Sequence, residues 1–80
     1  MGHARPRPVH LAAKLLRIRK ALGLSQNQLA ERLNAGIPYP NISKYEHDVN
    51  EPPLMVLLAY SKVSGVPVES LIDDQVDLPK

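Results

Sequence analysis

The stretch GLSQNQLAERLNAGIPYPNISKYE, residues 23–46, decides how this 80-residue chain folds. Its first part contains the start signal of a helix: Ser25 is a favoured N-cap, and Gln28 three residues later completes a capping-box pattern. Apolar residues then recur at the spacing of one helix face, namely Leu29, Ala30 and Leu33. These signals predict a helix over about residues 26–34.

The second part of the stretch predicts a short helix with a rigid entrance. Gly36 and Pro38 indicate a connector, and Pro40 suits the first turn of a helix, where a missing N–H costs little. Ile42 is the expected inward anchor of a helix over about residues 40–47. Most of the other side chains of this helix are polar: Asn41, Ser43, Lys44, Glu46 and His47.

Three further helices flank this stretch. Helical periodicity predicts one over about residues 9–22, whose apolar face carries Leu11, Leu15, Ile18 and Leu22. A proline pair at residues 52–53 opens another that runs to about residue 64, with an expected inner face of Leu54, Leu57, Leu58 and Ser61. A short fifth helix begins near Pro67 and contains Val68, Leu71 and Ile72.

The order of these elements predicts an all-α fold, a compact bundle of five short helices over residues 9–74. Gly23 and Gly65 are the expected stops of the first and fourth helices. Residues 1–8 contain two prolines and are expected to form an extended, flexible basic arm. Residues 75–80 are expected to form an acidic, loosely held tail.

Composition and charge narrow the function. With no cysteine, disulfides and thiolate metal sites are excluded, and a cytoplasmic, nucleoid-associated location is expected. The longest apolar run, residues 54–60, is far shorter than the about 20 residues of a membrane span, so no membrane partner is expected. Residues 1–44 have a net charge of +7 and residues 45–80 a net charge of −5. This asymmetry indicates a polyanionic partner, although a solvated basic face explains it equally well.

Three segments carry a resemblance to a known family. They are GLSQNQLAERL at residues 23–33, ISKYE at 42–46 and PPLMVLLAYSKVSGVPVESLI at 52–72. With them the chain resembles the Cro/phage-repressor class of helix-turn-helix domains, the XRE family, over about residues 15–72. The resemblance implies a lambda-repressor-like bundle whose helix around residues 40–47 enters the major groove of double-stranded DNA.

The resemblance also implies roles for individual residues. Gln26, at the start of the support helix, is expected to offer its amide to a DNA phosphate. Three residues of the recognition helix are expected to point toward DNA: Asn41, Ser43 and Lys44. Lys44 can pair with guanine or a phosphate, and Asn41 with adenine. Arg19 and Glu46 are expected to form a structural ion pair that fixes the angle of the recognition helix.

The spacing departs from the family pattern between Ala30 and Ile42, where this chain is two residues longer. The excess sits around residues 34–35, so either the support helix runs on by half a turn or the turn is wider. Tyr39 lies at the entrance of the recognition helix, where three roles stay open for it. It can stack on a sugar, contact a thymine methyl group, or cover the core.

The stretch after Glu46 departs from the pattern as well. Asp48 and Glu51 stand where relatives place phosphate-binding cations, which predicts weaker DNA binding per domain. Four basic side chains are candidates to compensate: Arg5 and Arg7 on the arm, and Lys14 and Arg17 beside it. A frayed terminus with incidental charge is an equally good explanation of the two arginines.

The leading hypothesis is a sequence-specific DNA-binding transcriptional regulator, a repressor, that acts as a homodimer on a palindromic site. The expected dimer interface is the apolar surface near Val68, Leu71 and Ile72, or the tail. The alternative is a protein-interaction module on the same fold, antitoxin-like or adaptor, which the acidic residues 48–51 favour.

An enzyme is not expected, because the sequence has no nucleophile elbow, phosphate-cradling glycine loop or zinc-binding pair. No cofactor, metal or small-molecule ligand is expected either. The three histidines lack metal-ligand spacing and are expected to be solvated or packing residues: His3, His10 and His47.

Overall fold

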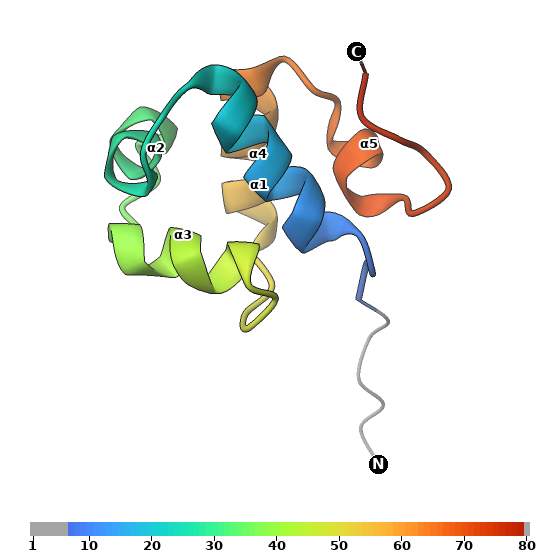
Figure 1. Ribbon diagram of the computed structural model, residues 1–80, viewed down its shortest axis with the longest axis horizontal. Coiled ribbons are helices and arrows are strands. Elements are labelled where there is room, and N and C mark those ends of the chain that lie inside the picture. The colour runs from blue at the N-terminus through green and yellow to red at the C-terminus, as the bar shows by residue number, and fades with distance from the viewer. Residues whose placement is uncertain (1–6, 80) are drawn as a thin grey trace.

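Five α-helices make up residues 7–79, the part of the chain that the computed structural model describes, and no strand occurs there. They are α1 (Leu11–Leu22), α2 (Gln26–Leu33), α3 (Tyr39–Glu46), α4 (Leu54–Ser64) and α5 (Val68–Ile72). In Figure 1, α2 and α3 lie on one side of α1, α5 lies on the other, and α4 lies behind α1. The expected all-α, five-helix fold is confirmed. Residues 1–6, most of the expected arm, lie outside the described part.

α1 is the centre of the core, since it packs against α3, α4 and α5. The second helix packs against α3 and α4. Eleven apolar side chains of residues 7–79 are buried: Leu11, Leu15, Ile18, Leu29, Leu33, Ile42, Tyr45, Val56, Leu57, Tyr60 and Leu71. Full burial of one such side chain contributes about 1.5–3 kcal/mol, so this cluster supplies the main term that favours folding.

The helix ends follow the sequence signals. Gly23 takes the left-handed conformation after α1 at φ 71°, and Gly65 does so after α4 at φ 75°. Glycine adopts this region without the steric cost that a Cβ atom imposes. At the start of α2, the capping box is complete, because Ser25 and Gln28 exchange both side-chain-to-backbone hydrogen bonds.

The buried face of α4 differs from the expected one. Its core side chains are Val56, Leu57 and Tyr60, whereas Leu54 is 72% exposed. Residues 54–60 are apolar or aromatic at every position, so periodicity does not single out a face. Packing against neighbouring helices decides which face of α4 is buried, because α4 contacts α1, α2 and α5.

Lys14, a candidate phosphate-binding residue in the sequence, is a buried cap of α5. Its Nζ donates to three backbone oxygens, those of Ser70 at 2.8 Å, Asp73 at 3.0 Å and Val76 at 2.7 Å. The last carbonyls of a helix lack helical partners, so an ammonium group satisfies them and its charge is favourable at that end. The expected contact of Lys14 with DNA is therefore wrong.

The segment after α5 is held against α1 and is not loose. The Asp74 carboxylate accepts hydrogen bonds from the backbone N–H of Val9 at 2.8 Å and of His10 at 3.0 Å. These donors favour the charged carboxylate and hold the pKa of Asp74 below its ordinary value. Leu78 packs against the core. Two segments far apart in the sequence are therefore in contact, because the Asp74 carboxylate accepts hydrogen bonds from the backbone just before α1. Among the helices of residues 7–79, none combines the length and apolar character needed to cross a bilayer.

Candidate nucleic-acid interface

A wide turn joins α2 to α3. The second helix ends at Leu33, and Asn34 follows in the left-handed region at φ 50°. Gly36 enters the same region at φ 72°, and Ile37 packs against the core. The residues after Leu33 therefore form a turn and do not extend the support helix.

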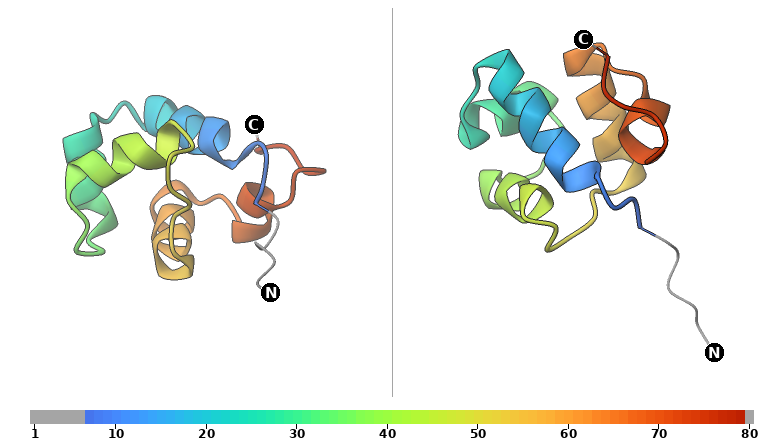
Figure 2. Two further views of the ribbon diagram at one scale, coloured as in Figure 1. Left: turned by 90° about the horizontal axis from the view of Figure 1, so that it is seen from below. Right: turned by 45° about the vertical axis from the view of Figure 1, so that its right-hand side comes forward.

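α3 presents one side to the core and the other to solvent. It begins after Pro38 and carries Pro40 in its first turn, where the N–H groups need no intrahelical partner. Three side chains face inward: Ile42, Tyr45 and Glu46. The outer side has four exposed residues, Tyr39, Pro40, Lys44 and His47, and two partly exposed ones, Asn41 and Ser43. In both views of Figure 2, α3 lies at the margin of the bundle on the side away from α5, so this outer side is open to a partner.

Tyr39 is 53% exposed at the first position of α3. A side chain with that exposure does not cover the core, which excludes one of its three possible roles. Stacking on a sugar and contact with a thymine methyl group remain predictions.

A bidentate ion pair holds α3 against α1. Arg19 Nε donates to Glu46 Oε2 at 2.7 Å, and Arg19 Nη2 donates to Glu46 Oε1 at 3.1 Å. The Glu46 side chain is only 2% exposed and that of Arg19 17%, so salt screens the pair weakly. The remaining nitrogen, Nη1, donates to the backbone oxygen of Leu24 at 3.0 Å. The pKa of Arg19 is raised, chiefly by the hydrogen bond to Glu46.

Gln26 belongs to the same network. Its Nε2 donates to Glu46 Oε1 at 3.2 Å, so the side-chain donor expected at a phosphate is engaged within the protein. The capping box satisfies the N–H of Gln28 through Ser25 Oγ at 3.1 Å. The N–H groups of residues 26 and 27 have no intrahelical partner, as in any first helical turn. A phosphate contact of Gln26 remains a prediction.

A support helix, a turn and a second helix with an open polar side are thus in place. The family model for helix-turn-helix domains matches residues 15–71 of the chain. The chain belongs to the helix-turn-helix family. The resemblance to the Cro/phage-repressor class is confirmed.

One solved structure with a similar helix-turn-helix fold is the P22 c2 repressor in complex with a synthetic operator in the presence of Tl+. It is 26% identical to this chain, with a TM-score of 0.72, and the match covers 80% of this chain and 94% of that one. No curated protein matches the sequence. Family and fold are those of DNA-binding transcription regulators and not of enzymes.

The segment after α3 pairs one of its acids within the helix-turn-helix domain. Asp48 adopts the left-handed conformation at φ 59°, and its Oδ1 accepts a hydrogen bond from Arg7 Nη2 at 3.0 Å. Asp48, the acid expected to repel a phosphate, is thus paired with Arg7, one of the basic residues expected to compensate for it. Arg5, the other arginine of the arm, lies outside the described residues.

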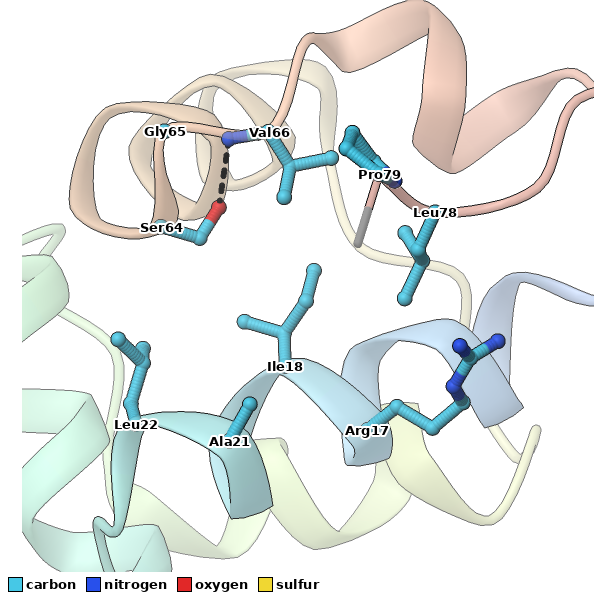
Figure 3. A pocket seen from close by; sticks show the side chains of 9 residues that line it. All are labelled: Arg17, Ile18, Ala21, Leu22, Ser64, Gly65, Val66, Leu78 and Pro79. Carbon is cyan, nitrogen blue, oxygen red and sulfur yellow. Dashed lines mark hydrogen bonds between the residues drawn. The ribbon is translucent and has the colours of Figure 1, made fainter.

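Arg17 does not join the surface around α3. It lies two positions from Arg19, which places the two side chains roughly 160° apart around α1. Arg17 Nη1 donates to Asp77 Oδ1 at 3.1 Å, and Figure 3 shows the Arg17 side chain next to Leu78. This placement gives no support to the expected DNA contact, because α3 packs on the other flank of α1, where Arg19 reaches Glu46.

His47 also lies on this surface, at the end of the helix where the sequence places it, although the sequence assigns it no binding role. It follows α3 directly, is exposed, and lies four residues after Ser43. The spacing of four residues was the available signal, since positions i and i+4 share a helix face.

Residues 7–79 contain no group of three or more acidic, histidine or cysteine side chains that could hold a metal ion.

Proposed function

We propose that this protein is a sequence-specific transcriptional repressor that inserts α3 into the major groove of DNA. The observation that carries the proposal is the open polar side of α3, held at a fixed angle to α1 by Arg19 and Glu46. An α-helix fits the major groove, where each base pair presents a distinct pattern of donors and acceptors. The P22 c2 repressor, which shares the fold, is bound to a synthetic operator in its structure.

Each exposed side chain of α3 has a chemistry suited to this role. Lys44 pairs with guanine O6 and N7 or with a phosphate, and Asn41 pairs with the adenine edge. The Ser43 hydroxyl donates a hydrogen bond to, or accepts one from, the edge of either base. Tyr39, at the start of the helix, contacts a thymine methyl group or a sugar. Gln26 approaches a phosphate at the N-terminus of α2, where the helix dipole favours an anion.

A homodimer is part of the proposal. α3 has eight residues and reaches only a few base pairs, so useful specificity needs two half-sites about one helical turn apart. Leu71, named from the sequence as part of the interface, is fully buried and therefore unavailable. Leu54 and the 43%-exposed Ile72 border one groove, which supports an interface around these two exposed apolar side chains.

The alternative, a protein-interaction module without DNA affinity, rested on the acidic residues 48–51. The ion pair between Asp48 and Arg7 weakens that argument, because a paired carboxylate repels phosphate less than a free one. We therefore favour DNA over a protein as the partner of α3.

The test is binding of the full chain to random-sequence duplex DNA over a range of salt concentrations. We expect binding that weakens steeply with salt, because Lys and Arg release counterions from the phosphates. Lys44→Ala should lower the affinity and, where Lys44 contacts a phosphate, reduce the salt slope by about 1. Lys62→Ala is the matched control, since Lys62 is an exposed lysine on α4. No binding even at about 50 mM salt, or equal behaviour of the two variants, would contradict the proposal.

A further inference from the structure

The four residues before α1 run between two carboxylates that belong to distant parts of the chain. On one side, Asp74 accepts hydrogen bonds from the backbone N–H of Val9 at 2.8 Å and of His10 at 3.0 Å, one on each carboxylate oxygen. On the other side, Arg7 Nη2 donates to Asp48 Oδ1 at 3.0 Å. This short segment therefore joins the tail after α5 to a residue that lies two positions beyond the end of α3.

Side-chain packing contributes little to holding this segment in place. Three of its four side chains are exposed, those of Arg7, Val9 and His10, and that of Pro8 is half-buried. The ion pair between Arg7 and Asp48 is exposed as well, since the two side chains are 44% and 63% accessible to solvent. Ordering the backbone of even one residue costs more free energy than an exposed ion pair contributes. The ion pair therefore does not order the segment by itself, and the two hydrogen bonds to the carboxylate of the tail supply the missing restraint.

Asp74 can act as this restraint because the backbone around it is anchored. Lys14 Nζ donates to the backbone oxygens of Asp73 at 3.0 Å and of Val76 at 2.7 Å, which lie on either side of Asp74 in the sequence. The N–H of Gln75 donates to Asp73 Oδ1 at 2.9 Å. The Asp74 carboxylate thus projects from a fixed turn and meets the two N–H groups with little further loss of conformational freedom.

We propose that Asp74 is a positioning residue for Arg7: it fixes the backbone before α1 and thereby keeps Arg7 beside Asp48, at the edge of the surface that meets DNA. Two residues of extended chain span at most about 7 Å, so fixing the backbone at Val9 confines Arg7 to a small volume around its partner. Arg7 then neutralises a carboxylate that otherwise repels the phosphates. The inference rests on the proposed function, because the quantity that changes is the affinity for DNA.

The first experiment compares the affinities of the unmodified full chain and of Asp74→Asn for one duplex at constant pH and salt. Asparagine has a similar size but no charge and only one acceptor oxygen, so the paired contact with the two N–H groups is lost. We expect binding about two- to fivefold weaker, the effect of one exposed ion pair. Removal of an acid ordinarily acts in the opposite direction, since it makes the net charge of the protein more positive. Glu69→Gln, which removes an exposed carboxylate from α5, is the matched control and should not weaken binding.

A double variant tests whether the effect of Asp74 acts through Arg7. Arg7→Gln should weaken binding at least as much as Asp74→Asn, and adding Asp74→Asn to it should cause no further loss. A general loss of stability would instead add to the effect of Arg7→Gln. Asp74→Ser, a second variant without the carboxylate, should behave like Asp74→Asn.

A measurement on the free protein tests the restraint without DNA. The NMR order parameters of the backbone amides of Arg7, Val9 and His10 should be about 0.85, as in rigid backbone, and should fall below about 0.6 in Asp74→Asn. The order parameters of α1 should be the same in both proteins.

The outcomes separate the two proposals. Three results would each overturn the positioning role and leave the proposed function standing: unchanged order parameters in Asp74→Asn, an unchanged affinity, or a loss of affinity that persists in the Arg7→Gln background. Absence of DNA binding by the unmodified protein would overturn the proposed function, and with it the effect of Asp74 on affinity.

Discussion

Arg19 Nε lies 2.7 Å from Glu46 Oε2, and this contact joins the middle of the structure to the helix proposed to read DNA. Both partners of a buried pair depend on each other, since removing one leaves an uncompensated charge in a place that solvent reaches poorly. Replacing either residue should therefore disturb both the stability of the domain and the angle of α3.

Arg19→Ala and Glu46→Ala are each predicted to lower the free energy of unfolding by about 3–5 kcal/mol. Urea denaturation followed by circular dichroism measures the change. Arg32→Ala is the control, because Arg32 is exposed on α2, and it should change the stability by less than about 0.5 kcal/mol. The pair has no structural role if Arg19→Ala denatures at the same urea concentration as the unmodified protein.

Lys14→Met is predicted to loosen α5 and the segment that follows it. Methionine fills similar space but donates no hydrogen bond, so the carbonyls of Ser70, Asp73 and Val76 lose their shared partner. We expect a loss of about 1–3 kcal/mol and faster amide exchange over residues 70–77. Lys20→Met, at an exposed position of the same helix, should change neither quantity. Unchanged exchange in Lys14→Met would mean that the ammonium does not hold this segment.

Asp74 is predicted to make the contact between the segment after α5 and the backbone just before α1 sensitive to acid. The pKa of its carboxyl is lowered in the folded protein by the N–H groups of Val9 and His10, so its stabilisation is complete above the unfolded pKa. That stabilisation is lost as the pH falls through the lower, folded pKa. Melting temperatures between pH 6 and pH 2 should therefore show Asp74→Ala less stable at pH 6 and the difference shrinking toward pH 2. Asp77, whose pKa is also lowered, titrates in both proteins and cancels in the comparison. A difference that does not vary with pH would contradict this role of Asp74.

Tyr60→Phe is predicted to be neutral or stabilising. The Tyr60 hydroxyl is buried, and no group among residues 7–79 forms a hydrogen bond with it. Burial raises the pKa of Tyr60, as does the nearby charge of Glu46. Removing a buried hydroxyl without a protein partner removes a desolvation cost and keeps the ring in the core. Thermal denaturation should show an equal or higher midpoint, whereas a fall of several degrees would indicate that the hydroxyl forms a stabilising interaction.

Much of the fold was predictable because its signals are local. The capping box of Ser25 and Gln28 and the glycine stops at 23 and 65 act through adjacent backbone groups, so the sequence alone indicates them. The face of α4 was not predictable, since its apolar residues run without a break and tertiary packing decides which of them turn inward.

The candidate site was predictable to a similar degree. The outer side of α3 follows from the buried positions of Ile42 and Glu46 and from the periodicity of the helix. The partners of the lysine and arginine side chains were not predictable, because Lys14, Arg17 and Arg7 each contact groups more than forty residues away in the sequence. No local pattern carries such contacts.

The most direct test of the account is an NMR titration of the isotopically labelled chain with a duplex selected from random sequence. Binding along the outer side of α3 predicts that the amide signals of Asn41, Ser43 and Lys44 shift most, together with those at the start of α2. Signals of α5 should move little, because α5 lies on the far side of α1. Shifts confined to α4 and α5, or no shifts at any DNA concentration, would contradict the claim that α3 reads DNA.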